Sequence, residues 1–284
     1  MKVYFDNAAT TPIRNEVIEL MIQSMSSTFG NPSSTHSFGR TAKSMIETAR
    51  KSIAKNLNCE PQEIIFTSGG TESDNMVLRC AVKDLKVRTI VSSVLEHHAV
   101  LHPLYELQKE GVNIRYVDLD EDGSPKLDHL ESILEADDTL KLVSLMHINN
   151  EIGNVLDLDR VGALCKAKCA YFHTDAVQGV GHFKFDLKSQ PIDFLSSAAH
   201  KFHGPKGVGF TFIRKNITID PFIAGGPQER GQRAGTESVH NIIGLQKAIE
   251  MAYENLEEES AYVLSLKKYF INNLKRLFPT AHFN

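Results

Sequence analysis

The chain has 284 residues, enough to bury a sizeable core in one large α/β domain or in a domain with a smaller lobe. Apolar residues at 42%, charged residues at 23% and a net charge of -4 are ordinary for a globular protein and do not suggest a nucleic-acid-binding surface. Asp6 and Asn7 stand where a signal peptide needs an apolar run, and no stretch reaches the ~18 apolar residues of a membrane helix. We therefore expect a cytoplasmic protein without membrane or nucleic-acid partners.

Seven short apolar and β-branched runs predict strands, at residues 63–68, 88–93, 113–119, 140–148, 170–176, 192–198 and 207–213. Several of the segments between them have apolar residues at three- and four-residue spacing, which predicts helices at 71–85, 98–111 and 127–138. Strands alternating with helices favour a doubly wound, mostly parallel α/β sheet covered on both faces. Ligands of such sheets bind at the carboxyl ends of the strands.

The last part of the chain predicts a long amphipathic helix over residues 260–279. Its apolar stripe comprises Val263, Leu266, Phe270, Leu274 and Leu277. An acidic stretch at 254–260 indicates a solvated hinge near residue 257. We therefore expect an N-terminal segment (1–15), a large domain (16–256) and the start of a second unit (257–284).

Four cysteines, Cys59, Cys80, Cys165 and Cys169, are too few for a disulfide framework, and none forms a C-x-x-C pair. Cys165 and Cys169 are four residues apart, which places them on one helical face. Packing is the favoured interpretation, because a zinc site would need further ligands that the sequence does not offer nearby. We expect no metal site.

A candidate anion site follows the first predicted strand, in the sequence FTSGGTESDN. Two glycines precede Thr71, whose hydroxyl and N–H would open the next helix, and a helix N-terminus attracts anions. A plain helix cap is the alternative, because Thr71 with Asp74 three residues later is close to a capping box. The usual nucleotide-binding fingerprints are absent.

Polar residues also follow three other strands. Asp175 stands at the end of an apolar strand, where a buried carboxylate needs a cation or hydrogen bonds, although such a residue is equally often a turn or cap residue. Gln178 lies three residues further on. The remaining strand-end candidates, each weak alone, are His97 and His98 after one strand and Asn149, Asn150 and Glu151 after another.

Lys201 follows the strand at 192–198, between His200 and His203 and ahead of a Gly-Pro-Lys-Gly turn. A surface lysine is the ordinary interpretation. Burial in a crevice, however, lowers a lysine pKa by up to about 3 to 5 units, and a neutral amine forms a Schiff base with an aldehyde. An anion cradle, a strand-end Asp, a strand-end His and such a Lys together match the requirements of pyridoxal 5'-phosphate.

With these motifs the sequence resembles the cysteine desulfurases, pyridoxal-phosphate enzymes of the class V aminotransferase type. The resemblance runs from Tyr4 to about Phe278. It rests on YFDNAATTP, FGNPSSTHSFGR, FTSGGTESDN, EHHAV, MHINNEIG, HTDAVQGVG, HKFHGPKGVG and GGPQERGQRAGTES, in the family's order. It implies the fold of the PLP-dependent transferases (fold type I), with a large cofactor-binding domain and a small C-terminal domain.

The resemblance also implies roles for individual residues. Lys201 would form the Schiff base with the cofactor, Asp175 would pair with the ring nitrogen, and His97 would stack on the ring and take part in proton transfer. Gln178 would bond the ring hydroxyl and Asn150 would lie near the ring and substrate. The phosphate would be held by Gly70, Thr71 and His200, and by Thr236 of a neighbouring subunit, from the loop that carries Arg230 and Arg233. A homodimer is therefore implied.

The sequence departs from the family at two places. Ala198 replaces the usual phosphate-binding serine, so one phosphate contact is missing or is replaced by Ser196 or Ser197. The family's persulfide-forming cysteine and the arginine that binds the substrate carboxylate belong to a C-terminal region that these residues do not match. None of the four cysteines lies in a matching motif. Because the matching residues end where the small domain should begin, we expect that domain to be largely absent. Without its cysteine and arginine, we expect this chain to be inactive alone.

The resemblance implies that L-cysteine is converted to L-alanine and that the sulfur is passed as an enzyme persulfide to an acceptor or scaffold protein, for iron–sulfur cluster assembly or another pathway. Two alternatives stay open. One is a different class V enzyme, such as a selenocysteine lyase or an aminotransferase. The other is a fragment that binds cofactor or a partner without turnover.

Overall fold

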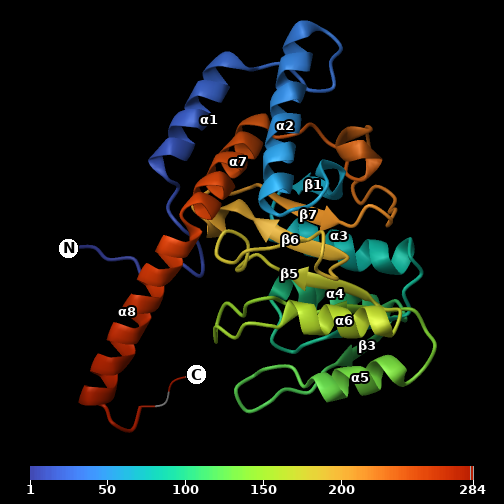
Figure 1. Ribbon diagram of the computed structural model, residues 1–284. Coiled ribbons are helices and arrows are strands. Elements are labelled where there is room, and N and C mark those ends of the chain that lie inside the picture. The colour runs from blue at the N-terminus through green and yellow to red at the C-terminus, as the bar shows by residue number, and fades with distance from the viewer. Residues whose placement is uncertain (282, 284) are drawn as a thin grey trace.

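A computed structural model describes residues 1–281 and 283, and its centre is a seven-stranded sheet of order β1-β7-β6-β5-β4-β2-β3 (Figure 1). The strands are β1 (Ile64–Thr67), β2 (Thr89–Ser92), β3 (Asn113–Tyr116), β4 (Lys141–Ser144), β5 (Tyr171–Asp175), β6 (Phe194–Ala198) and β7 (Gly209–Ile213). Neighbouring strands from β3 to β6 pair in parallel, whereas β7 is antiparallel to both β6 and β1. All seven predicted strands are present, and the mostly parallel sheet is confirmed.

The helices are α1 (Asn15–Ser27), α2 (Ser37–Asn56), α3 (Gly70–Lys83), α4 (His98–Lys109), α5 (Leu127–Glu135), α6 (Leu158–Ala167), α7 (Val239–Glu254) and α8 (Leu256–Leu277). Three short 3-10 turns are η1 (Pro61–Glu63), η2 (Ala199–Lys201) and η3 (Gln228–Gly231). The predicted helices at 71–85, 98–111 and 127–138 correspond to α3, α4 and α5.

Helices cover both faces of the sheet. Successive strand residues point to opposite sides, so each strand contributes apolar side chains to both faces. Ile65 and Leu142 pack with α3 and α4 on one side, while Ile64 and Val143 belong to the larger core formed with α2, α6 and α7 on the other. The α1 and α2 helices pack against α7 (Figure 1). This confirms the doubly wound α/β architecture.

The α8 helix leads away from the sheet, as Figure 1 shows, and none of its residues is buried. Its apolar stripe lies open, with Val263 at 62%, Phe270 at 63% and Leu277 at 72% exposure. Asn255 separates α7 from α8, close to the predicted hinge. The division of the chain into domains stays a prediction. Among the described residues, no helix has the length and apolar character needed to cross a membrane.

The prediction that Cys165 and Cys169 share a helical face is wrong. The α6 helix ends at Ala167, between the two cysteines. Cys165 is buried in the core, whereas Cys169 is exposed and has a φ of 53°. The turn after the helix rotates the second thiol away from the first. Within residues 1–281 and 283, no group of three or more His, Cys, Asp or Glu side chains is placed to hold a metal ion.

A buried ion pair fixes the glycine-rich loop that follows β7. Arg50 of α2 donates from its two terminal nitrogens to Glu229 of η3, at 2.7 and 2.8 Å, and also bonds the carbonyl of Ile64. The Glu229 carboxylate also accepts the N–H of Phe66 at 2.8 Å. Glu229 and Arg230 have φ values of 44° and 57°, so these contacts hold the loop in a left-handed conformation that costs free energy.

We predict that Glu229→Gln destabilises the fold by about 3 to 5 kcal/mol, because it removes the only buried carboxylate that pairs with the Arg50 charge among the described residues. Glu47→Gln is the matched control, since Glu47 also pairs with Arg50 but is 38% exposed, and its loss should cost about 1 kcal/mol or less. Urea unfolding of both variants measures the difference. Equal effects of the two substitutions would contradict the assignment.

Candidate active site

A cavity of about 670 Å³ lies at the carboxyl ends of the parallel strands. It brings together eight of the nine site residues predicted from the sequence: Gly70, Thr71, His97, Asn150, Asp175, Gln178, His200 and Lys201. They come from segments that follow β1, β2, β4, β5 and β6. Residues far apart in the chain therefore meet at one edge of the sheet, as the rule for α/β sheets predicts.

The N-terminus of α3 forms one end of this cavity. Gly69 is the N-cap, with a φ of 148°, and no side chain caps the helix. A Cβ at Gly70 would lie 2.6 Å from Cγ2 of Val177, so only glycine fits there. The alternative interpretation of Thr71 as a helix cap is therefore wrong: Thr71 lies inside the first turn and Asp74 is buried one turn later. The uncapped N–H groups suit an anion such as a phosphate.

Lys201 ends η2, directly after β6, and is partly buried. Its Nζ donates hydrogen bonds to the carbonyl oxygens of Ala8 and Ala9 in the N-terminal segment. Burial lowers the pKa of Lys201, although the charges of Asp175 and Asp6 oppose that shift. A larger fraction of this amine is therefore uncharged, and nucleophilic, than on an exposed lysine.

Asp175 is the last residue of β5 and is 5% exposed. Burial raises the pKa of its carboxyl group, while the N–H of Val177, at 2.9 Å, and the charges of His97 and Lys201 lower it. A further cation in the cavity would stabilise the carboxylate, and a protonated pyridine nitrogen is such a cation.

Hydrogen bonds to neighbouring loops and helix ends hold the other polar residues of the cavity in place. His97 is the N-cap of α4, and its Nδ1 accepts the N–H of Ala99 at 3.1 Å, so Nε2 carries the proton of the neutral ring. Gln178 donates to the Ala8 carbonyl at 2.8 Å. Asn150 donates to Glu151 at 2.7 Å, and His200 Nδ1 lies 3.1 Å from the Thr10 hydroxyl.

Thr236 is the one predicted residue that does not line this cavity. It lines a smaller pocket beside Ser68 and Arg233. Arg233 forms an ion pair with Glu72, at 2.7 and 3.1 Å, and so ties the glycine-rich loop to the first turn of α3. Arg230 instead lies 3.4 Å from Glu47. The expected role of Thr236 at the phosphate of a neighbouring subunit stays a prediction.

Ala198 lines the cavity, but neither serine before it does. Ser196 Oγ lies 3.0 Å from Nε2 of His173, inside the protein, and Ser197 is fully buried without a hydrogen-bond partner. The sequence left open whether a phosphate contact is missing or is made by one of these serines, and their positions outside the cavity lining favour the first alternative.

Other lining groups were missed from the sequence: Asp6, Asp74, Met146 and Val177, with the backbone of Ala8 and Ala9. Asp74 could have been found, because it is four residues after Gly70 and so lies one helical turn further on the same face. Asp6 and the two alanines belong to an irregular segment whose path no periodicity reveals.

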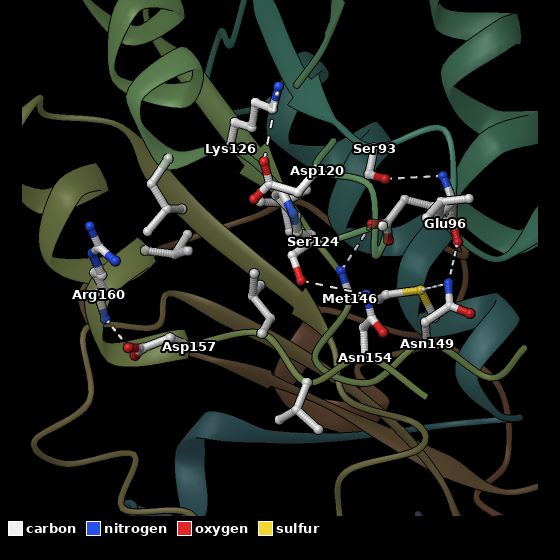
Figure 2. Close-up of a pocket in the computed structure, with 18 of the residues that line it drawn as sticks. Ser93, Glu96, Asp120, Ser124, Lys126, Met146, Asn149, Asn154, Asp157 and Arg160 are labelled. Carbon is white, nitrogen blue, oxygen red and sulfur yellow. Dashed lines mark hydrogen bonds and ion pairs between the residues drawn. The ribbon is translucent and has the colours of Figure 1, made fainter. Parts of the chain in front are cut away.

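A second cavity, of about 600 Å³, lies beside the first at the ends of β2 and β4; it contains none of the nine predicted site residues, but the strand-end candidate Asn149 lines it. Figure 2 shows the Glu96 carboxyl group there, near Met146, whose backbone N–H donates to it at 3.0 Å. Met146 lines both cavities. Burial raises the pKa of Glu96 well above its usual range. The loop after β2 therefore sends His97 into one cavity and Glu96 into the other.

None of the four cysteines lines the cavity of Lys201. Burial raises the pKa values of Cys59, Cys80 and Cys165 to about 12, so these three are thiols at neutral pH. Cys169 is exposed in the turn after α6. No arginine of the described residues lines this cavity either.

Comparisons with known proteins place this chain in a family. Residues 3–281 match the class-V aminotransferase family. The cysteine desulfurase IscS of Methanosarcina thermophila is 46% identical, over 99% of this chain and 70% of its own length. That of Dictyoglomus turgidum is 45% identical, over 100% and 72%. The chain thus spans about seven tenths of these relatives.

Solved structures show the same relationship. A NifS-like protein superimposes with a TM-score of 0.93 at 41% identity, over 98% of this chain and 77% of that one. The NifS-like protein of Rickettsia africae gives 0.89 at 34% identity, over 97% and 76%. This chain therefore belongs to the class-V aminotransferase family of pyridoxal-phosphate-dependent enzymes, and within it to the cysteine desulfurases.

Proposed function

We propose that this chain provides the cofactor-binding part of a cysteine desulfurase, which converts L-cysteine to L-alanine and retains the sulfur for transfer. The observation that carries the proposal is the meeting of Lys201, Asp175 and the uncapped N-terminus of α3 in one cavity. These three groups offer an amine, a carboxylate and an anion cradle, which are the complement of pyridoxal phosphate. The cysteine desulfurase relatives support the choice of substrate.

Each end of the cofactor has a matching group in the cavity. Gly70, Thr71 and His200 would hold the phosphate, and Asp175 would face the ring nitrogen. His97 would lie against the ring, Gln178 would bond its hydroxyl, and Asn150 would lie beside ring and substrate. When bound, the cofactor supplies an electron sink for bond cleavage at the substrate Cα.

Proton movement falls to Lys201 and His97. Because burial lowers the pKa of Lys201, its Nζ gives up and takes up a proton more readily than the amine of an exposed lysine. The His97 ring is fixed through Nδ1, so Nε2 is the atom that can exchange a proton. Burial raises the pKa of Asp175, and the N–H of Val177 and the charge of Lys201 oppose that shift; a protonated ring nitrogen would further stabilise the carboxylate.

We also propose a homodimer, in which Thr236 of one subunit reaches the phosphate of the other, and a sulfur-acceptor or scaffold protein as partner. The position of Thr236 outside the Lys201 cavity of its own chain supports the first proposal. Iron–sulfur cluster assembly in the cytoplasm is the proposed setting, by analogy with the family.

We propose that the thiol which accepts sulfur is none of the four cysteines. Cys59, Cys80 and Cys165 are held as buried thiols, and Cys169 lies in the turn after α6, outside the cavity lining. A nucleophile must reach the reacting atom, since positioning contributes several kcal/mol to such a step. These 284 residues should therefore bind the cofactor without efficient turnover of cysteine.

We predict that pyridoxal phosphate attaches to Lys201. After incubation with the cofactor and borohydride reduction, peptide mass spectrometry should find the pyridoxyl group on Lys201. Lys201→Ala should abolish it, while Lys188→Ala, which removes an exposed lysine, should not. If the visible absorbance of the Schiff base between cofactor and lysine persists in Lys201→Ala, the assignment of Lys201 is wrong.

Asp175→Asn should retain the cofactor but slow exchange of the substrate Cα proton by about 100-fold or more, because an amide cannot keep the ring nitrogen protonated. Proton exchange followed by NMR in deuterium oxide measures this, with the exposed Asp138→Asn as control. Exchange at the parent rate would show that Asp175 has another role.

The cofactor-loaded 284-residue protein should release alanine from cysteine no faster than Lys201→Ala. Alanine and sulfide are quantified in the presence of a reductant. Turnover that requires Lys201 and is lost in Cys169→Ser would show that Cys169 supplies the thiolate, against our proposal.

A further inference from the structure

A cluster of buried polar side chains lies behind the cavity wall formed by β5. His173 is fully buried, with Nδ1 at 2.9 Å from Ser144 Oγ and Nε2 at 3.0 Å from Ser196 Oγ. Both ring nitrogens are thus engaged with uncharged hydroxyl groups, and the cluster joins β4, β5 and β6. Because strand side chains alternate, His173 and Asp175 lie on the same face of the sheet.

Asp74 connects this cluster to the cavity. It lines the cavity beside Asp175, yet it is only 1% exposed. Its Oδ1 lies 3.6 Å from Nε2 of His173 and has no hydrogen-bond partner among the described residues. A buried carboxylate in such a position is expensive, since neither a cation nor an N–H donor compensates its charge.

The groups that face Asp74 from the surrounding elements are Asp175 and His173 on β5, Glu96 before α4 and Ser196 on β6. None is positive at neutral pH, because burial lowers the pKa of His173 to about 3. Burial, together with the charges of Asp175 and Glu96, raises the pKa of Asp74 well above its usual range, and the Ser196 hydroxyl offsets this only in part.

Asp175 has a different environment. The charge of Lys201 and the N–H of Val177 favour its ionised form and oppose the burial that raises its pKa, and Asp74 has neither of these partners. Two buried carboxyl groups close together do not both ionise readily, since each negative charge raises the pKa of the other. The surroundings therefore assign the negative charge to Asp175 and the proton to Asp74.

We propose that Asp74 is a positioning residue that remains a neutral carboxylic acid beside the uncharged His173 and Ser196, so that Asp175 alone is negative opposite the cofactor ring nitrogen. The inference rests on the proposed placement of that nitrogen at Asp175. An ionised Asp74 would compete for the ring cation and would weaken the preference for Asp175. A neutral Asp74 can instead donate its O–H to the Ser196 hydroxyl or the His173 ring.

The test compares Asp74→Asn with the wild-type holoenzyme, because asparagine has the shape and charge of the neutral acid. The midpoint of the pH titration of cofactor absorbance should shift by less than about 0.3 units. Loss of an ionised neighbour would instead shift it by about one unit or more. At pH 8 the infrared carbonyl band of protonated carboxyl groups should be weaker in Asp74→Asn than in wild type.

An unchanged infrared band, or a shift of a full unit, overturns the proposal. If Asp74→Asn does not fold, the infrared band is measured in the Glu96→Gln holoenzyme. There the band should persist, because the protonated Asp74 still contributes to it. Absence of the band would equally overturn the proposal. Failure of the proposed function is separate: it appears as no pyridoxyl group on Lys201 after borohydride reduction, whatever the infrared band shows.

Discussion

Asp175 is a carboxyl group buried at the end of a central strand, and such a group can keep its charge only with compensation from its neighbours. The surrounding loops supply it: the segment after β6 brings Lys201, the segment after β2 brings His97, and the turn after β5 offers the N–H of Val177. The arrangement depends on parallel strands that end at the same edge. Had β5 run in the opposite direction, its carboxyl end and Asp175 would lie at the other edge of the sheet.

The surroundings of the α3 N-terminus depend on two ion pairs, one buried and one partly buried. The Arg50–Glu229 pair links α2 to η3, and the Arg233–Glu72 pair links the glycine-rich loop to α3. Together they place the loop that carries Thr236 next to the uncapped N-terminus of α3. A loop with two left-handed non-glycine residues keeps one conformation because these contacts outweigh the backbone strain.

Periodicity predicted the seven strands and four of the helices. Of these helices α3, α4 and α5 bury an apolar face, whereas α8, expected at 260–279 and observed at Leu256–Leu277, leaves its apolar stripe exposed. Periodicity overestimated β4, for which 140–148 was expected and Lys141–Ser144 is observed, since the loop beyond it is also apolar where it lines the cavities. The alternative of a cap at Thr71 fails because the glycine pair, not the hydroxyl residue, begins α3. Cys169 was misplaced because a left-handed turn ends α6 two residues earlier.

The strand-end residues were predictable because they follow apolar runs directly, and motif resemblance added their roles. Asp74 and His173 were not, because their relationship is tertiary. His173 reads as a polar residue inside a strand, and Asp74 reads as a helix-cap partner. Only the packing of α3 against β5 and β6 brings the two together. Nothing in the local spacing indicates which of two aspartates will be charged.

The N-terminal segment is held by the same groups that are proposed to hold the cofactor. The Ala8 carbonyl accepts hydrogen bonds from both Lys201 and Gln178, and a typical bond of this kind contributes about 0.5 to 1.5 kcal/mol. A ligand that engages these two side chains must displace that carbonyl, so the segment acts as an internal competitor and its bonds reduce the ligand's affinity. Thr11 is bonded separately to the His200 carbonyl, so any release would be confined to the residues before it. Ligand binding in the cavity and release of the first ten residues are then thermodynamically linked, so a change in one equilibrium changes the other.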